Sequence, residues 1–281
     1  MLRIIFNAHS QVAVPPESRF VTELWTGSPD IEVDDFMARL AAHRQFRNWE
    51  LDLDAVRAEM PGGPRVHYRA AVEAAYLAYA KRNGKSRWGD KTPRYVEKIP
   101  FLADLWPEAA FVHLVRDGRN VALSYAKVPF GPKTVPKVAV LWSQRVTTGA
   151  RDGRRLGPER YIEVRYEDFV EDPEGCVKKL CSMLDLTFEP SMLEYSEVVE
   201  KMVFAKASTY NPHVFEPPRP GVRTWQSEMT DPQVRLFEAI AGGALEMFGY
   251  PRRYSRLGPA TKLAASLGRM GIPIGRLRKE G

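Results

Sequence analysis

Arg116 and Ser124 stand eight residues apart in a run whose pattern predicts a strand, a tight turn and a helix. In open α/β sheets, ligands bind at the carboxyl ends of strands, and a helix that starts there presents free backbone N–H groups to an anion. The Arg116 guanidinium can form a bidentate contact with a phosphate, and Ser124 can add a hydroxyl. The alternative is an arginine that pairs with a carboxylate such as Asp117 or Glu97. This run alone leaves both interpretations open.

Lys91 occupies a second turn between a short strand and a helix. Thr92 is the expected N-cap of that helix, and Pro93 is its expected first residue. A cation gains nothing from the positive end of a helix, so Lys91 makes more sense if an anion lies beside it. The alternative is a solvated lysine on a loop.

Two further segments carry side chains that suit a nucleotide. Tyr166 ends a predicted strand and precedes an acidic turn, where its ring can contact a base or close the core. A later basic loop with one tryptophan fits a flap over a phosphate or an adenine, but also a plain connector; its residues are Arg219, Gly221, Arg223 and Trp225.

Strands and helices must alternate to position these residues. Strand-like runs cover residues 12–14, 86–89, 110–115 and 160–164, and helical patterns cover 66–81, 93–105, 118–125, 136–150, 173–184 and 232–247. Asp231 is the expected N-cap of the last helix. Such alternation predicts a parallel sheet with helices on both faces, which is the α/β class.

Composition excludes several classes of protein. The 281 residues carry 41 Lys and Arg against 35 Asp and Glu, and no run reaches the ~18 apolar residues of a membrane span. The first apolar run is too short for a signal peptide, and Cys176 and Cys181 are expected to be reduced thiols, so we expect a cytoplasmic protein. No His/carboxylate cluster has ligand spacing, so no metal is expected. A kinase would need a G-x-x-x-x-G-K-S/T loop, and none occurs.

Together and in this order, the segments resemble the sulfotransferases that use 3′-phosphoadenosine-5′-phosphosulfate (PAPS), in particular the bacterial branch related to tyrosylprotein sulfotransferases. The resemblance covers residues 1–251 and implies one sulfotransferase domain with a P-loop-like central parallel sheet flanked by helices. It implies that Arg116 and Ser124 hold the 3′-phosphate, that Tyr166 contacts the adenine, and that Lys91 lies at the transferring sulfuryl group. The late loop would close over the nucleotide through Arg219, Gly221, Arg223 and Trp225.

Residues 9–19 resemble the family's stretch that ends in an acidic residue at the active site. The resemblance implies that Glu17 is the catalytic base and that Arg19 faces the substrate; otherwise Glu17 is a carboxylate at a helix N-terminus. The implied reaction moves the sulfuryl group of PAPS, a co-substrate, to a hydroxyl or amine of a small-molecule, carbohydrate or peptide acceptor. The alternative is an inactive truncated relative that only binds adenosine 3′,5′-bisphosphate or a partner.

One landmark of the family is absent from the sequence. The family's first strand leads into a P-R-S-G-T-T loop around the 5′-phosphosulfate, and both should directly precede residues 2–6. We therefore expect the first strand and the phosphosulfate loop to be missing from this chain. A misassigned start codon is favoured over a truncated gene, because Glu17, Lys91, Arg116, Ser124 and Tyr166 all persist. A stop codon directly upstream, with no Gly/Ser/Thr-rich loop before Met1, would rule this explanation out.

Residues 252–281 lie outside the resemblance and are expected to form a basic tail. They contain eight basic residues and one acidic residue, so residues 1–251 hold 33 basic and 34 acidic residues and are nearly neutral. Nucleic-acid binding is therefore not expected. Leu263, Leu267 and Met270 recur at helical spacing, so the tail is expected either to lie on an anionic membrane surface or to be a disordered, solvated segment.

Overall fold

The structure is a computed structural model of residues 1–281, and it describes residues 1–194, 224–256 and 258–272. The chain divides into two compact units. Unit 1 comprises Met1–Tyr95, Phe101–Pro107 and the described part of Leu186–Pro217. Unit 2 comprises Val96–Pro100, Glu108–Asp185 and the described part of Pro218–Gly281.

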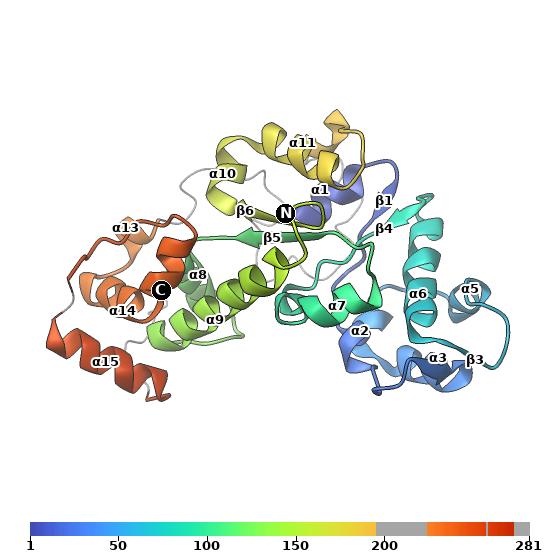
Figure 1. The fold of residues 1–281 in the computed structure, drawn as a ribbon, viewed down its shortest axis with the longest axis horizontal. Helices are drawn as coiled ribbons and strands as arrows, with labels where there is room; N and C mark the ends of the chain where they lie inside the picture. Colours follow the sequence, from blue (N-terminus) through green and yellow to red (C-terminus); the bar gives the residue numbers. More distant parts are fainter. Residues whose placement is uncertain (195–223, 257, 273–281) are drawn as a thin grey trace. The chain divides into compact units, whose positions relative to one another are not determined.

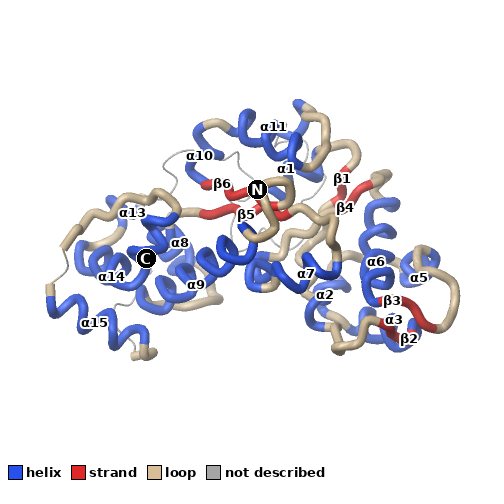
Figure 2. The backbone as a smooth tube through the Cα atoms, viewed as in Figure 1, coloured by secondary structure: helices blue, strands red, loops and turns tan. Residues whose placement is uncertain are grey.

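Unit 1 contains two small sheets and several helices. Its strands are β1 (Val12–Ala13), β2 (Asp30–Glu32), β3 (Arg65–His67) and β4 (Arg87–Trp88). β1 pairs with β4 in parallel, and β2 pairs with β3 antiparallel (Figure 2). Its helices are α1 (Leu2–Ala8), α2 (Phe20–Glu23), α3 (Val33–Ala42), α4 (Arg44–Arg47), α5 (Leu53–Ala58), α6 (Tyr68–Arg82) and the 3₁₀ helix η2 (Pro190–Leu193), whereas η1 (Pro93–Glu97) and α7 (Ile99–Leu105) contribute residues to both units.

An aromatic cluster forms the core of unit 1. The Phe20 ring lies 5.2 Å from that of Trp49, which lies 5.1 Å from Tyr76, and Tyr76 stacks on Trp88 at 4.3 Å. Trp49 and Tyr68 are both fully buried, so they are core residues. The cluster fixes α6 against the start of α2 and against β4.

Unit 2 is built around the parallel strands β5 (Phe111–Val115) and β6 (Tyr161–Arg165), which pair along their whole length (Figure 1). Its helices are α8 (Gly118–Lys127), α9 (Val135–Arg154), α10 (Tyr166–Glu171), α11 (Pro173–Met183), α13 (Trp225–Glu228), α14 (Asp231–Met247) and α15 (Pro259–Arg269). The core lies where α8, α9 and α14 pack together around Trp142 and Phe237.

The expected α/β class is confirmed, since each unit contains a parallel strand pair with helices packed beside it. Some element boundaries differ from the prediction. The helix expected from residue 66 begins at Tyr68, because Arg65–His67 pairs with β2 and the His67 side chain accepts from the backbone N–H of Arg69. The helix expected over residues 93–105 is divided into η1 and α7. Pro100 has no backbone N–H to continue a helix from η1, but it is tolerated in the first turn of α7, where that N–H has no partner within the helix.

The expected cap of α14 was wrong by one residue. Thr230, not Asp231, is the N-cap, and its side chain and that of Gln233 form a reciprocal capping box. None of the helices in the described part of the chain is long and apolar enough to cross a membrane.

Candidate functional site

In unit 1, Glu17 and Lys91 lie against each other. Lys91 Nζ is 2.7 Å from Glu17 Oε1. The two side chains are 37% and 42% exposed, so the pair borders solvent and remains accessible to a ligand. Lys91 is therefore not simply a solvated loop lysine.

The contact follows from the pairing of β1 with β4. The strands run parallel with Ala13 opposite Trp88, so the loops that follow them leave the same edge of the sheet. Glu17 lies on the loop after β1, and Lys91 lies on the loop after β4. These carboxyl ends are where open α/β sheets place ligands.

Hydrogen bonds hold these two loops together directly behind the ion pair. The backbone N–H of Ser18 donates to Thr92 Oγ1 at 3.0 Å, and the Ser18 hydroxyl lies 2.8 Å from the Tyr95 hydroxyl. Trp49 Nε1 donates to the carbonyl of Pro16 at 2.9 Å. Thr92 is thus a buried loop partner in addition to preceding η1.

Arg19 has a backbone conformation that is unusual for a residue other than glycine. Its φ is +54°, in a region that costs such residues about 1–3 kcal/mol and that is enriched at functional sites. Its carbonyl accepts from the backbone N–H of Glu23 as α2 begins. The sequence alone did not predict this strain beside Glu17.

Asp90, next to Lys91, was also not singled out from the sequence. Burial raises the pKa of its carboxyl group, although hydrogen bonds from Ser18, Tyr76 and Thr92 and the charge of Lys91 oppose the shift. The Tyr76 hydroxyl donates to Asp90 Oδ2 at 2.6 Å, while Oδ1 is buried without a partner among the described residues.

In unit 2, the structure brings Arg116 and Tyr166 together at the carboxyl ends of β5 and β6. Arg116 Cζ lies 4.5 Å from the centre of the Tyr166 ring. Arg116 is half-buried, and its Nε is buried without a hydrogen-bond partner among the described residues. The carboxylates named as alternative partners are engaged elsewhere, Asp117 with Arg119 and Glu97 with Arg145.

Ser124 lies within α8, half-buried, and its hydroxyl donates to the carbonyl of Asn120 at 3.1 Å. The start of α8 differs from the expectation of free N–H groups, because the Asp117 side chain accepts from the N–H of Arg119 at 2.9 Å. Part of the anion-binding capacity of this helix end is therefore already used by the protein's own carboxylate.

Glu167 links the turn that carries Arg116 to the start of α10, which carries Tyr166. Its Oε1 accepts from the backbone N–H of Asp117 at 3.1 Å, and its Oε2 lies 2.7 Å from the Tyr250 hydroxyl. The only sequence signal for this role was its position directly after Tyr166. Glu167 thus holds the start of α10 against the turn after β5.

A buried charge network underlies the same turn. Arg119 is fully buried and contacts Asp117 Oδ2 and Glu238 Oε1, each at 2.7 Å. Its guanidinium also lies 3.7 Å from the centre of the Trp225 ring. The network joins α8 to α13 and α14.

Trp225 is a core residue of unit 2, only 6% exposed. Its backbone N–H donates to Asn120 Oδ1 at 2.9 Å, which ties the start of α13 to α8. Little of the indole surface is left to touch a nucleotide. The other expected members of this loop, Arg219, Gly221 and Arg223, lie outside the described residues.

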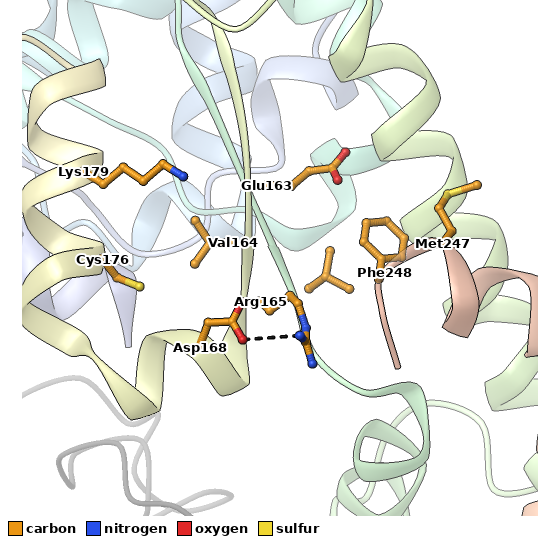
Figure 3. A pocket seen from close by; sticks show the side chains of 9 residues that line it. Glu163, Val164, Arg165, Asp168, Cys176, Lys179, Met247 and Phe248 are labelled. Atoms are coloured by element: carbon orange, nitrogen blue, oxygen red, sulfur yellow. Dashed lines mark ion pairs between the residues drawn. The ribbon is translucent and has the colours of Figure 1, made fainter. Parts of the chain in front are cut away.

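A pocket of about 310 Å³ lies beside the end of β6, between α11 and the C-terminal end of α14 (Figure 3). Arg165 contacts Asp168 at 3.4 Å on one side of it, and Lys179 and Cys176 face it from α11. Burial raises the pKa of the Cys176 thiol, and neither Cys176 nor Cys181 is part of a disulfide. No group of three His, Cys, Asp or Glu side chains within residues 1–194, 224–256 and 258–272 is arranged to hold a metal ion.

A profile described as the Sulfotransferase family matches residues 1–190 of this chain. The chain belongs to the sulfotransferase family. This chain is 24% identical over 201 residues to the nodulation protein NoeE of Sinorhizobium fredii, and the match covers 63% of the chain and 47% of NoeE. It is 21% identical over 262 residues to the protein-tyrosine sulfotransferase of Drosophila melanogaster, which covers 89% of the chain and 49% of the fly protein.

A shorter match is to the omega-hydroxy-beta-dihydromenaquinone-9 sulfotransferase Stf3 of Mycobacterium bovis, with 32% identity over 108 residues, which are 34% of this chain and 28% of Stf3. The chain spans about half the length of NoeE and of the fly enzyme.

Two solved structures share the fold. The sulfotransferase domain of the Synechococcus PCC 7002 olefin synthase matches with a TM-score of 0.60 and 21% identity, over 89% of this chain and 90% of that domain. The sulfotransferase domain of the curacin biosynthetic pathway matches with a TM-score of 0.52 and 16% identity, over 94% and 91%. At these identities the likeness establishes the fold alone.

Proposed function

We propose that this sulfotransferase moves the sulfuryl group of PAPS to an acceptor hydroxyl, with Glu17 as the base and Lys91 as the cation at the reacting sulfur. The observation that carries the proposal is the 2.7 Å contact between these two side chains at a solvent-bordering strand edge. A carboxylate and an ammonium group held together there can take up a proton and stabilise developing negative charge.

In the proposed reaction, Glu17 accepts the proton of the acceptor and Lys91 stabilises the charge of the leaving group. The acceptor oxygen attacks sulfur while its proton passes to a Glu17 carboxylate oxygen. The bond between sulfur and the bridging oxygen breaks, and its electron pair stays on the 5′-phosphate, where the Lys91 ammonium stabilises the charge. The products are a sulfate ester and adenosine 3′,5′-bisphosphate. Arg19, at the strained position two residues after Glu17, is proposed to face the acceptor.

We assign the nucleotide to residues of unit 2. Arg116 is proposed to bind the 3′-phosphate, Ser124 to add a hydroxyl, and Tyr166 to contact the adenine. The support is the position of Arg116 over the Tyr166 ring and its buried Nε, which has no hydrogen-bond partner in the described part of the chain. An arginine that no described carboxylate neutralises suits a phosphate. Trp225 is proposed to anchor the end of the preceding nucleotide loop, in which Arg219, Gly221 and Arg223 would contact the nucleotide.

The names of two relatives support the proposed acceptor class. The name of the fly enzyme indicates a tyrosine acceptor for that protein, and the name of Stf3 indicates an omega-hydroxyl acceptor for that one. We therefore propose a hydroxyl on a small molecule, carbohydrate or peptide, and assign residues 1–251 to the transferase domain. No step of the proposed chemistry requires a metal ion.

The test is a transfer assay with PAPS labelled in its sulfuryl group and a panel of phenols, carbohydrates, tyrosine peptides and hydroxylated lipids. We expect labelled product, and we expect Glu17→Gln to lower kcat by roughly 10²–10⁴ while leaving the affinity for adenosine 3′,5′-bisphosphate unchanged. Glu23→Gln, which alters an exposed carboxylate of α2, is the matched control and should retain activity.

Two outcomes would overturn the proposal. Binding of the bisphosphate without transfer to any acceptor class would favour a relative that only binds the nucleotide. Transfer that is equally fast in the wild-type protein and in Glu17→Gln would remove Glu17 from the role of base.

A further inference from the structure

Helix α15 leaves an apolar face uncovered in unit 2. Its inner face is closed by Ala265 and Gly268, which are buried where α15 packs on α9 and α14 (Figure 1). Leu263 and Met270 project from the other side, two turns apart, and are 64% and 68% exposed. The adjoining Ile272 is 45% exposed. This part of the basic tail is therefore an ordered amphipathic helix, not a solvated coil.

The surroundings of this face carry uncompensated positive charge. Residues 252–272 contain five basic residues and no acidic residue. Arg252 and Arg253 pair with carboxylates of unit 2. Arg256, Lys262 and Arg269 form no ion pair among the described residues, and Arg269 instead donates to backbone carbonyls of α14.

A basic pocket of about 350 Å³ lies between α14 and α15, lined by Arg252, Lys262 and Arg269. Arg252 Nε is buried there without a hydrogen-bond partner among the described residues. Gly243 leaves the pocket open, because a Cβ at this position would meet no atom within 4 Å. Glu238 also borders the pocket, but its side chain is fully buried and its carboxylate already accepts from Arg119 and from two backbone N–H groups.

The basic pocket and the apolar face adjoin each other on α15. Lys262 directly precedes Leu263, and Arg269 directly precedes Met270. The two basic residues therefore lie on a face of the helix next to the one that carries the two apolar residues. A helix with an apolar face and a cationic flank suits the boundary between lipid headgroups and acyl chains. The charge selects headgroups with net negative charge, since each basic residue near such a surface contributes attraction.

We propose that α15 and the basic pocket form a docking surface for an anionic membrane. Leu263 and Met270 enter the acyl boundary, and a lipid phosphate lies in the pocket beside Lys262 and Arg252. The inference is independent of the proposed reaction, because it uses none of the residues assigned to sulfuryl transfer.

The test is co-sedimentation of the full chain with vesicles of phosphatidylcholine alone or with about a third phosphatidylglycerol. We expect binding to the anionic vesicles only, and loss of binding at high salt. Leu263→Ser/Met270→Ser should weaken binding at least roughly tenfold, since it removes two side chains from the acyl boundary. Lys262→Ala should weaken it roughly fivefold, the equivalent of about 1 kcal/mol per charge.

A pocket-filling change separates the pocket from general charge attraction. Gly243→Leu keeps every charge but occupies the open space, so it should weaken binding, whereas Gly243→Ala should not. Phe130→Ser/Lys137→Ala removes an exposed aromatic and an exposed lysine elsewhere in unit 2 and is the matched control.

Circular dichroism of each variant establishes that it is folded. Equal binding to neutral and anionic vesicles, absence of vesicle binding, or unchanged binding by the Leu263→Ser/Met270→Ser variant would each overturn the proposal. An acidic protein partner for this face would give the second of these results.

Discussion

At the scale of single residues, the Glu17–Lys91 pair combines proximity with accessibility. Both side chains are more than a third exposed, and ion pairs of this kind contribute only about 0–1 kcal/mol to stability. An incoming sulfuryl group and acceptor can therefore separate them at little cost. The pair therefore suits the role proposed for it in sulfuryl transfer, and it adds little to stability.

In contrast to the exposed Glu17–Lys91 pair, the charge network around Arg119 is buried. Arg119 and Glu238 are fully buried, and Asp117 is nearly so, which means that each charge depends on the others for compensation. Removal of a partner from such a network leaves an uncompensated charge in the core. Because Asp117 directly follows Arg116, the network also fixes the turn from which the proposed phosphate ligand projects.

We predict that Arg119→Ala lowers the free energy of unfolding by about 3–5 kcal/mol, because it strands two buried carboxylates. Urea unfolding at neutral pH measures this change. Arg57→Ala, which removes an equally short but exposed pair with Asp34, is the matched control and should cost less than about 1 kcal/mol. Equal costs for the two variants would contradict the role given to the network.

At the scale of elements, the site depends on parallel strands whose following loops leave the same edge. The strands were predictable because apolar runs bounded by turn residues are a local signal, and the residues after them pointed to anion binding. The pairing of β1 with β4 was not predictable, since it joins segments more than 70 residues apart. The contact of Arg119 with Glu238, across 119 residues, is non-local for the same reason.

Local signals also competed with one another. Asp231 and Thr230 are both good N-cap residues, and Gln233 decided the outcome by completing a capping box with Thr230. Trp225 was expected in a nucleotide loop because it follows a basic segment. Trp225 is instead buried against Arg119 and against core residues of α9 and α14. Those contacts are distant in the sequence, so the sequence of the loop alone could not predict the burial.

We predict that Gly118→Ala destabilises unit 2 by about 1–3 kcal/mol, because overpacked cores cost that much. A Cβ at Gly118 would lie 2.5 Å from the Trp142 ring and 2.6 Å from Phe237. Thermal unfolding measures the effect. Gly243→Ala, in the open position of α14, is the control and should be neutral or stabilising by up to about 1 kcal/mol, from helix propensity. A neutral Gly118→Ala would show that α8 can shift away from α9.

At the scale of the whole molecule, the net charge of +6 separates into a nearly neutral body and a basic C-terminal segment. The body's cations that matter for the proposed reaction are few and placed at strand ends. A general attraction for polyanions is therefore not needed to explain the basic composition.

The stability of the molecule should also depend on His113, which is buried between β5 and α9 and lies 2.6 Å from the Tyr161 hydroxyl. Burial lowers the pKa of His113 from 6.5 to about 4. As the pH falls, His113 is therefore protonated in the unfolded chain before it is protonated in the folded protein. The contribution of neutral His113 to the free energy of unfolding is therefore fully present above pH 6.5 and decreases as the pH falls from 6.5 to 4. Below pH 4 this group causes no further decrease, and the total decrease is on the order of 3 kcal/mol.

We predict that His113→Asn flattens this part of the curve of unfolding free energy against pH. Denaturant unfolding at a series of pH values measures the slope. His67→Asn, which changes an exposed histidine at the start of α6, should keep the wild-type slope. Parallel curves for wild type and His113→Asn would place the acid sensitivity in other groups.

Use of a 3′-phosphorylated nucleotide is the feature on which the proposed function depends, and calorimetry measures it directly. Adenosine 3′,5′-bisphosphate should bind at least roughly tenfold more tightly than adenosine 5′-monophosphate, because a charge-assisted contact with the 3′-phosphate is worth about 1.5–3 kcal/mol. Arg116→Ala should remove most of this difference. Equal affinities for the two nucleotides in the wild-type protein, or a preference that survives Arg116→Ala, would contradict the account.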